Sequence, residues 1–407
     1  MEQQHNDVLL RVEHLCQYFG STKAVDDVSF EIRKGEVLGM VGESGCGKTT
    51  TGRSVIKLYN ITSGDIYYKG IRIGAGIMSY KKAIAEARAN YRAKVAELRA
   101  DGGDHTAELA QMKADLTAFI QDQKAKIKAA QFDQLHCDKA YSAQLVAEVK
   151  AKYEPLFASA SQEELPQLKK DYRNALRVAK KTKLVTQIQM IFQDPIASLD
   201  PRMTVREIIA EGLIIQGERD KEKINEKVYE VLEMVGLVRE HASRYPHEFS
   251  GGQRQRIGVA RAIIMKPELI IADEPVSALD VSIQAQVINL LNDLRQQLGL
   301  TIMFIAHDLS VVKYFSDRIA VMYFGKLVEL APSDELFAHP LHPYTRSLLS
   351  SIPLPDPEYE KNRKRIVYNP LAEHDYTVSK PTLREVKPGH FVYCNDAEYQ
   401  AYVEAVQ

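Results

Sequence analysis

Apolar residues follow two different spacings along this chain, and the change of spacing divides it into four regions. Residues 1–74 hold short segments rich in β-branched residues separated by turns such as Arg33–Glu36, which predicts strands around one helix. In residues 184–330, helical patterns alternate with compact apolar runs, which predicts a largely parallel α/β sheet; the runs are 187–193, 268–274 and 301–307. Residues 331–407 are rich in Pro and Tyr, and we expect a small appended region there.

The remaining region, residues 75–183, has a helical pattern throughout. It is rich in Ala, Lys, Gln and Glu, and its apolar residues recur every three or four positions, as on amphipathic helices. Gly102-Gly103 divides the first stripe from the second, and Pro155 with a Ser/Ala stretch divides the second from the third. We expect an antiparallel helical hairpin or small coiled-coil bundle that protrudes from the core, either with a binding role or as a solvated insertion without one.

Composition narrows the possible classes of protein. The chain has 407 residues and a formal net charge of −1, which argues against nucleic-acid binding driven by bulk charge. No apolar run approaches the roughly 18 residues of a membrane-spanning helix, and the first ten residues lack the pattern of a secretory signal. The four cysteines are scattered without a CxxC pair, which suits a reducing compartment and excludes a disulfide framework or a cysteine-rich zinc site.

A glycine-rich segment between a predicted strand and a predicted helix fits G-x-x-x-x-G-K-[ST], and it runs from Gly42 to Thr49. Glycines let the backbone wrap a polyphosphate with its N–H groups pointing inward, and the helix N-terminus faces the same anion. We expect Lys48 to contact the β- and γ-phosphates and Thr49 to bind Mg²⁺. Cys46 is interpreted as a small loop residue, with a redox-sensitive thiol beside the nucleotide as the alternative.

An acidic pair follows the apolar run at 269–272. A buried strand of this kind delivers a carboxylate to the sheet edge where ligands bind in α/β folds. Asp273 would support Mg²⁺, and Glu274 would point elsewhere and polarise an attacking water. Taken alone, the pattern also fits a buried strand capped by two solvated acids.

A second anion-binding helix start is predicted at 249–256, where Ser250-Gly251-Gly252-Gln253 precedes a helical pattern. Two phosphate-binding helix ends are unusual in one monomer. They are expected if two chains pair head to tail, so that the platform of each closes the phosphate site of the other.

With these motifs in this order, the sequence resembles the ABC ATPases, the motor subunits of ABC transporters. The resemblance implies an α/β P-loop NTPase (RecA-like) cassette with an antiparallel β subdomain and a helical signature subdomain, here carrying the inserted helical hairpin and a small C-terminal extension. The implied ATP-binding residues are Phe19 or Tyr18 as the adenine-stacking aromatic, then Gly42, Glu43, Ser44, Gly45, Cys46, Gly47, Lys48, Thr49, Thr50, Gln193 and His307.

The resemblance also implies catalytic roles for Glu274, His307, Gln193 and Lys48, with Mg²⁺ held by Thr49, Gln193 and Asp273. The signature that acts on the partner's ATP corresponds to Phe249, Ser250, Gly251, Gly252 and Gln253, where Phe249 replaces the usual leucine. The D-loop corresponds to Ser277, Ala278, Leu279 and Asp280.

A narrower resemblance, to oligopeptide and dipeptide importer ATPases, comes from the segments 188–205 and 339–353. It implies a subunit at the cytoplasmic face of the cell membrane. The implied partners are a second ATPase, more often a paralogue than an identical chain, two permease subunits and, indirectly, an extracytoplasmic solute-binding protein, with no nucleic acid. Some members carry a C-terminal cysteine cluster, whereas this tail has only Cys394, so we expect no iron–sulfur cluster.

Three alternatives remain at this point. A DNA-repair or chromosome-structure ATPase would carry a much longer arm placed after the Q-loop, whereas residues 75–183 precede Gln193. A tandem-cassette translation factor would need a second phosphate loop. An exporter ATPase is disfavoured by the segment at 339–353.

Overall fold

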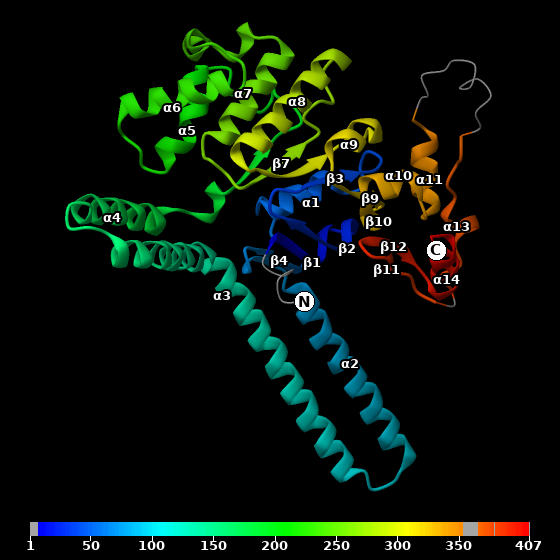
Figure 1. Ribbon diagram of the computed structural model, residues 1–407. Helices are drawn as coiled ribbons and strands as arrows, with labels where there is room; N and C mark the ends of the chain where they lie inside the picture. The colour runs from blue at the N-terminus through cyan, green and yellow to red at the C-terminus, as the bar shows by residue number, and fades with distance from the viewer. Residues whose placement is uncertain (1–6, 353–364, 378, 407) are drawn as a thin grey trace.

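The computed structural model describes residues 7–352, 365–377 and 379–406. Two parts of the sequence analysis fall outside these residues: residues 1–6, which belong to the segment interpreted as lacking a signal, and Pro353. Two sheets form the centre of the molecule (Figure 1). The smaller one is antiparallel with the order β2-β1-β4-β5. Its strands are β1 (Val8–Phe19), β2 (Thr22–Arg33), β4 (Ser63–Tyr68) and β5 (Ile71–Ala75).

The larger sheet has eight strands in the order β11-β12-β10-β9-β3-β8-β7-β6. Five neighbours are parallel: β9 (Arg318–Tyr323), β3 (Val37–Val41), β8 (Thr301–Ile305), β7 (Leu269–Asp273) and β6 (Ile188–Ile191). Every residue of β3, β7 and β8 is buried, which explains why their sequences are continuous apolar runs instead of alternating patterns.

Three antiparallel strands extend this sheet beyond β9: β10 (Lys326–Pro332), β12 (His390–Cys394) and β11 (Thr382–Lys387). The C-terminal residues are therefore not only an appendage, because a hairpin from 382–394 pairs with the main sheet. The expected boundary between 330 and 331 falls inside β10. This pairing joins strands about 60 positions apart, which no local pattern could indicate.

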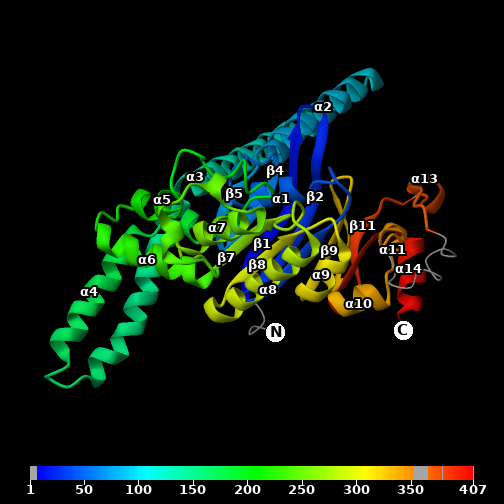
Figure 2. The ribbon, with the colours of Figure 1, turned by 90° about the horizontal axis from the view of Figure 1, so that it is seen from above.

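The apolar core has two parts, one on each side of the larger sheet. On one side the antiparallel sheet packs against it, with α1 (Lys48–Val55) contacting β1 and β2 as well as β7 and β8. The other side is covered by helices, which also form a group at one end (Figure 2). These helices are α5 (Val205–Ile215), α6 (Lys221–Met234), α7 (Gly251–Ile263), α8 (Val281–Leu298) and α9 (Leu309–Phe315).

Short helical elements complete the chain. Two 3-10 turns, η3 (Arg239–Ser243) and η4 (Pro246–Glu248), lead into α7. The C-terminal helices are α10 (Ser333–Ala338), α11 (Pro343–Ser350), α13 (Pro370–Glu373) and α14 (Asp396–Ala405). Within the described residues, no helix is long and apolar enough to span a bilayer.

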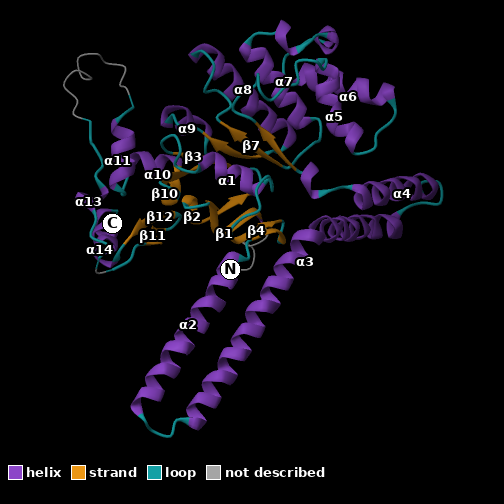
Figure 3. Cartoon of the chain, turned by 180° about the vertical axis from the view of Figure 1, so that it is seen from behind, coloured by secondary structure: helices purple, strands orange, loops and turns teal. Residues whose placement is uncertain are grey.

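The insertion forms two helical arms (Figures 1 and 3). Helix α2 (Met78–Asp101) lies antiparallel to the first part of α3 (Thr106–Ser159), and the last part of α3 lies beside α4 (Leu165–Lys181). A 3-10 turn, η2 (Leu184–Thr186), leads back to β6. The prediction of an antiparallel hairpin with a turn at Gly102 is confirmed, since Gly102 ends α2 with a φ of 73°.

The predicted break at Pro155 and its Ser/Ala stretch is confirmed for the Ser/Ala stretch, since α3 ends at Ser159 and α4 begins at Leu165, but it is wrong for Pro155 itself, which lies inside α3. The rings of Tyr153 and Phe157 each lie 5.3 Å from the ring of Tyr172 in α4. This contact on both sides of Pro155 holds the last turn helical, so tertiary packing overrides the local preference of proline.

The insertion is attached to the core near the middle of α3. The Arg72 guanidinium of β5 bonds Asp133 at 2.6 and 2.9 Å, and the rings of Tyr68 and Tyr141 are 6.2 Å apart. Few other side chains of the insertion are buried; within α2–α4 they are Ile84, Gln123, Ala130, Cys137, Tyr141 and Ala179. Both arms therefore extend from this attachment into solvent.

Candidate active site

The loop between β3 and α1 is shaped by three glycines at positive φ, two of which have no space for a Cβ. Gly42, Gly45 and Gly47 have φ values of 147°, 82° and 108°. A Cβ at Gly42 would lie 2.2 Å from the Met322 carbonyl oxygen, and one at Gly47 would lie 2.3 Å from the Ala24 carbonyl oxygen. The loop therefore has the conformation of a backbone cradle in front of the N-terminus of α1.

Lys48 places its ammonium group inside this loop. Its Nζ donates hydrogen bonds to the carbonyl oxygens of Gly42 at 2.7 Å and Glu43 at 2.9 Å, and the side chain is buried. The loop borders a cavity of about 400 Å³. The structure brings together here most of the residues expected to meet the nucleotide: Ser44, Gly45, Gly47, Lys48, Thr49, Thr50, Gln193, Glu274 and His307.

Cys46 sits under the loop as a buried packing residue. Its thiol is buried, and a Cβ at Gly42 would come within 2.8 Å of its sulfur. Burial raises the pKa of the Cys46 thiol, which disfavours the reactive thiolate. The structure thus supports the interpretation of Cys46 as a small loop residue over that of a redox sensor.

Asp273 and Thr49 form the polar pair expected to hold a metal. The Thr49 hydroxyl donates to Asp273 Oδ1 at 2.7 Å, while Asp273 Oδ2 is buried and has no hydrogen-bond partner among the residues that the structure describes. Burial raises the pKa of Asp273. A buried carboxylate oxygen left without a partner is costly, and oxygen ligands of this type suit Mg²⁺, so the residues present fit this ion.

Glu274 follows β7 directly but turns away from Asp273. Its φ of 45° is rare for a residue with a side chain, and its N–H donates to the Ile305 carbonyl at 2.9 Å. Its Oε2 accepts from Gln193 Nε2 at 3.0 Å and lies 3.2 Å from His307 Nδ1. These three side chains follow β7, β6 and β8, so they meet at the carboxyl edge of the parallel strands, where α/β sheets bind ligands.

Gln193 contacts the predicted general base and not the predicted metal ligands. Its amide bonds Glu274 in this structure, whereas the resemblance also implies a contact with Mg²⁺. Among the expected metal ligands, the structure thus pairs Thr49 and Asp273 with each other and leaves Gln193 beside the predicted general base.

The signature residues lie at the start of α7, outside this cavity. Ser250 and Gln253 form a reciprocal capping box, with N–H to side-chain oxygen distances of 3.1 and 3.4 Å. A Cβ at Gly252 would lie 2.6 Å from Ile283 Cγ2, so the backbone approaches α8 closely. Phe249 is buried and does not face the nucleotide cavity. The structure does not bring this helix end to Lys48 within one chain.

The D-loop residues connect the Glu274 turn to α8. The Ser277 hydroxyl donates to the Glu274 carbonyl at 3.1 Å, and Asp280 is the N-cap residue of α8. Ala278 and Leu279 complete the turn, and Leu279 lies against Gly251 of the signature. The segment therefore links the predicted general base with the predicted platform for the partner's nucleotide.

Of the two candidate aromatic residues, Phe19 has the free ring. It is 46% exposed and meets Tyr59 edge-on at 5.3 Å. The Tyr18 hydroxyl instead donates to Asp26, and burial together with this bond raises the pKa of Tyr18. The structure thus favours Phe19 for stacking, although neither ring lines the cavity of about 400 Å³.

Tyr344 is a loop contact that the sequence analysis missed. Its buried hydroxyl accepts a hydrogen bond from the Glu43 N–H at 3.1 Å, and its ring packs against Tyr323 at 4.4 Å. The segment around it was noted only as a family feature. Because Tyr344 and Glu43 are 301 positions apart, no local signal could have connected them.

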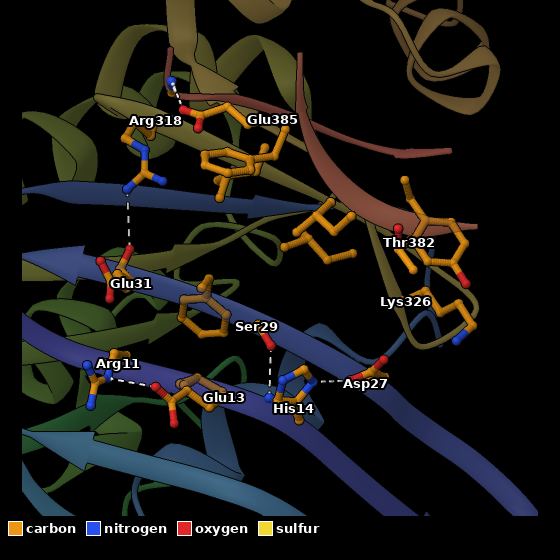
Figure 4. A pocket seen from close by; sticks show the side chains of 18 of the residues that line it. Arg11, Glu13, His14, Asp27, Ser29, Glu31, Arg318, Lys326, Thr382 and Glu385 are labelled. Carbon is orange, nitrogen blue, oxygen red and sulfur yellow. Dashed lines mark hydrogen bonds and ion pairs between the residues drawn. The ribbon is translucent and has the colours of Figure 1, made fainter. Parts of the chain in front are cut away.

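A larger cavity, of about 1030 Å³, lies between β1–β2 and β11–β12 (Figure 4). Its charged groups are of both signs, and some of them pair: Arg11 with Glu13 and His14 with Asp27, while Arg318 donates to the backbone carbonyl of Glu31 (Figure 4). It has neither a glycine cradle nor a helix N-terminus, so the smaller cavity is the better phosphate site.

Two family models match the chain. The ABC transporter model matches residues 25–148 and 156–277, which include every motif residue up to Ser277 except Phe19 and Tyr18. A second model, the C-terminal region of oligopeptide/dipeptide transporters, matches residues 328–377 and includes Tyr344.

Curated relatives match over nearly the full length. The oligopeptide transport ATP-binding protein OppF of Bacillus subtilis is 46% identical over 399 residues, which cover 97% of this chain and 98% of that protein. The dipeptide transport ATP-binding protein DppF of Lactococcus lactis subsp. cremoris is 40% identical, covering 94% of this chain and 91% of that protein. A solved ATP-binding cassette of an ABC transporter in its ADP conformation has the same fold, with a TM-score of 0.52, 19% identity and coverage of 85% and 99%.

Proposed function

The chain belongs to the ABC transporter ATP-binding family, and on that premise we propose that it is the ATPase motor of an importer for oligopeptides, dipeptides or a related small solute. The convergence of Lys48, Gln193, Glu274 and His307 on one cavity carries the proposal, because it assembles the parts of a phosphoryl-transfer site. The names of the relatives and the match at 328–377 support the solute class.

The loop and Lys48 bind the polyphosphate of ATP. The inward N–H groups and the N-terminus of α1 face the anion, and Lys48 exchanges its two carbonyl partners for phosphate oxygens. Thr49 and Asp273 would hold Mg²⁺, which neutralises charge on the β- and γ-phosphates when bound.

Glu274 is the general base in this proposal. Its carboxylate polarises the attacking water and accepts its proton, while Gln193 and His307, which meet the same Oε2, orient the water. The strained φ of Glu274 aims the carboxylate away from Asp273, so two adjacent acids serve two separate tasks.

The site is completed by a second ATPase. The capped N-terminus of α7, with Ser250 to Gln253, would close on the partner's γ-phosphate, because it lies away from the cavity of its own chain. Hydrolysis removes the bridging phosphate and the pair opens. We expect a paralogue as this second ATPase, two permeases at the cytoplasmic face of the membrane, and an extracytoplasmic solute-binding protein that delivers the solute.

The test is a pull-down from detergent-solubilised membranes. Tagged Glu274→Gln protein is captured with Mg-ATP, and the eluate is identified by mass spectrometry; Lys48→Ala protein, which should not bind ATP, is the matched control. We expect two multi-span permeases and a second ATPase, with the second ATPase retained more strongly by Glu274→Gln. Recovery of DNA-associated or ribosomal proteins in place of permeases would contradict the proposal.

The solute class has its own test. The complex with the unmodified chain is reconstituted into lipid vesicles with ATP enclosed in the lumen and the solute-binding protein outside, and uptake of labelled oligopeptides into the lumen is measured. Uptake that requires ATP and is lost in Glu274→Gln supports peptide import. Transport of peptides out of the lumen would instead indicate an exporter.

A further inference from the structure

Helix α4 and the residue pair that follows it carry an unusual surplus of positive charge. Between 165 and 183 the sequence has seven Lys or Arg residues and one acid, Asp171, in a chain whose net charge is −1. All seven cations are exposed, and none forms an ion pair with a residue that the structure describes. They are Lys169, Lys170, Arg173, Arg177, Lys180, Lys181 and Lys183.

The charges of α4 lie on one face of the helix. With 3.6 residues per turn, the six cations within the helix fall on an arc of about 120°. The apolar residues occupy the opposite side: Tyr172 packs against Tyr153 and Phe157 of α3, and the Ser142 hydroxyl of α3 donates to the Ala179 carbonyl at 3.1 Å. Because α3 covers the apolar side, the basic face points away from the insertion.

Repulsion between these like charges is mildly unfavourable, and a bound anionic surface would relieve it. Lys169, Arg173, Arg177 and Lys181 are each four positions apart, a spacing at which like charges repel on a helix. In the described chain no carboxylate lies within ion-pair distance of these four residues. The row is about 18 Å long, at 1.5 Å per residue, and helix α4 lies at an outer edge of the molecule (Figures 1 and 2).

We propose that the basic face of α4 docks on the anionic phospholipid headgroups of the membrane beside which the transporter works. A face of long, flexible cations within an arc of about 120° can reach a flat anionic surface, and juxtamembrane basic clusters bind such surfaces. Since α3 already covers the apolar face, α4 lies on the headgroups without inserting, and its binding depends on salt. The inference rests on the proposed function only in placing the subunit at a membrane.

The experiment measures binding of the full-length chain to vesicles. Sedimentation with phosphatidylglycerol-containing vesicles is compared with pure phosphatidylcholine vesicles, each at low and high salt. The test variant is Lys169→Gln, Arg173→Gln, Arg177→Gln and Lys181→Gln combined, because glutamine keeps the helix propensity. The matched control is Arg88→Gln, Arg92→Gln, Lys113→Gln and Lys124→Gln combined, which removes four equally exposed charges from the other arm.

We expect binding only to the anionic vesicles, weakened by salt and by roughly tenfold or more in the α4 variant, with the control close to the unmodified chain. Equal binding by the α4 variant and the control, or no preference for anionic vesicles, would overturn the inference. Tighter salt-matched binding of duplex DNA than of vesicles would also overturn it. Circular dichroism of both variants checks that the helices are intact.

Failure of this inference is distinguishable from failure of the proposed function. ATP hydrolysis by the complex in detergent requires no lipid surface, so it should be unchanged in the α4 variant. If the chain binds anionic vesicles through α4 but captures no permease, the membrane-docking inference stands and the importer proposal is contradicted.

Discussion

The nucleotide cavity and the helical insertion differ in how many close contacts fix their geometry. In the cavity, single atoms decide the geometry: a glycine without space for a Cβ, a carboxylate oxygen shared by two side chains, and a glutamate at positive φ. In the insertion, 54 residues of α3 bury only four side chains and contact the core near the middle of the helix. The chemistry of the nucleotide cavity therefore depends on individual residues, whereas the properties of the insertion depend on its exposed surface and its total charge.

Glu274→Gln should give the largest effect. Glutamine keeps the shape of the side chain but cannot accept the proton of the attacking water, so we expect hydrolysis to slow by about 10²–10⁴-fold. ATP binding should persist, because Lys48 and the loop are unchanged. The measurement is steady-state ATPase activity and bound nucleotide in the assembled complex. A near-normal turnover would remove Glu274 from the role of general base.

The second largest effect that we expect is a loss of stability toward unfolding at acid pH, caused by His342 in the C-terminal region. Burial, and then the charges of His374 and Arg346, lower the pKa of His342 to about 3, below the unfolded value of 6.5. Below pH 6.5, His342 is therefore protonated in the unfolded chain but stays neutral in the folded chain. The contribution of His342 to stability is complete above pH 6.5 and is lost as the pH falls toward 3. The expected loss between pH 6.5 and pH 5 is about 2 kcal/mol.

His342→Asn tests this assignment. The His342 Nδ1 accepts the Tyr344 N–H at the start of α11, and asparagine can cap the same position without titrating. Denaturant unfolding of both proteins at several pH values should show a flatter profile for the variant. An unchanged slope would assign the acid sensitivity to other groups.

Tyr344→Phe should have a smaller effect, a reduced affinity for ATP, and it acts through the phosphate-binding loop. It removes the acceptor for the Glu43 N–H, a hydrogen bond worth about 0.5–1.5 kcal/mol, and loosens the loop beside Lys48. We expect ATP affinity to fall threefold to tenfold, with less change in the hydrolysis rate at saturation. Tyr368→Phe removes a hydroxyl from the same ring cluster without touching the loop, and it should leave the affinity unchanged.

Shortening the outer hairpin should have the smallest effect. Replacing residues 90–116 with a short Gly/Ser turn removes the tip of α2 and α3 but keeps the contacts of Arg72 and Tyr68 with α3. We expect ATPase activity within about twofold of the unmodified complex, since interactions far apart contribute independently. A large loss would show that the tip contacts the partner ATPase or the permease.

Much of the nucleotide site could be predicted because its residues follow local patterns. The glycines before Lys48 lie in a turn between a predicted strand and a predicted helix, and the acid after β7 follows an apolar run. The histidine after β8 was predicted only from the family resemblance. The order of the strands then brings them to one edge of the sheet. The stripes of the insertion likewise predicted its helices and the turn at Gly102.

The parts that could not be predicted depend on contacts between distant segments. The sharing of one Glu274 oxygen by Gln193 and His307, the Tyr344 contact with the loop, and the pairing of β12 with β10 all join residues far apart in the sequence. The helix through Pro155 is the same case, because packing against Tyr172 outweighs the local signal.

One crossed measurement tests directly whether the two regions act separately. ATPase activity of the assembled complex and binding of the chain to anionic vesicles are measured for Glu274→Gln and for the fourfold α4 variant. Glu274→Gln should lose hydrolysis and keep vesicle binding, and the α4 variant should do the reverse. If either variant loses both properties while remaining folded, catalysis and membrane contact are coupled and the account of two independent regions is wrong.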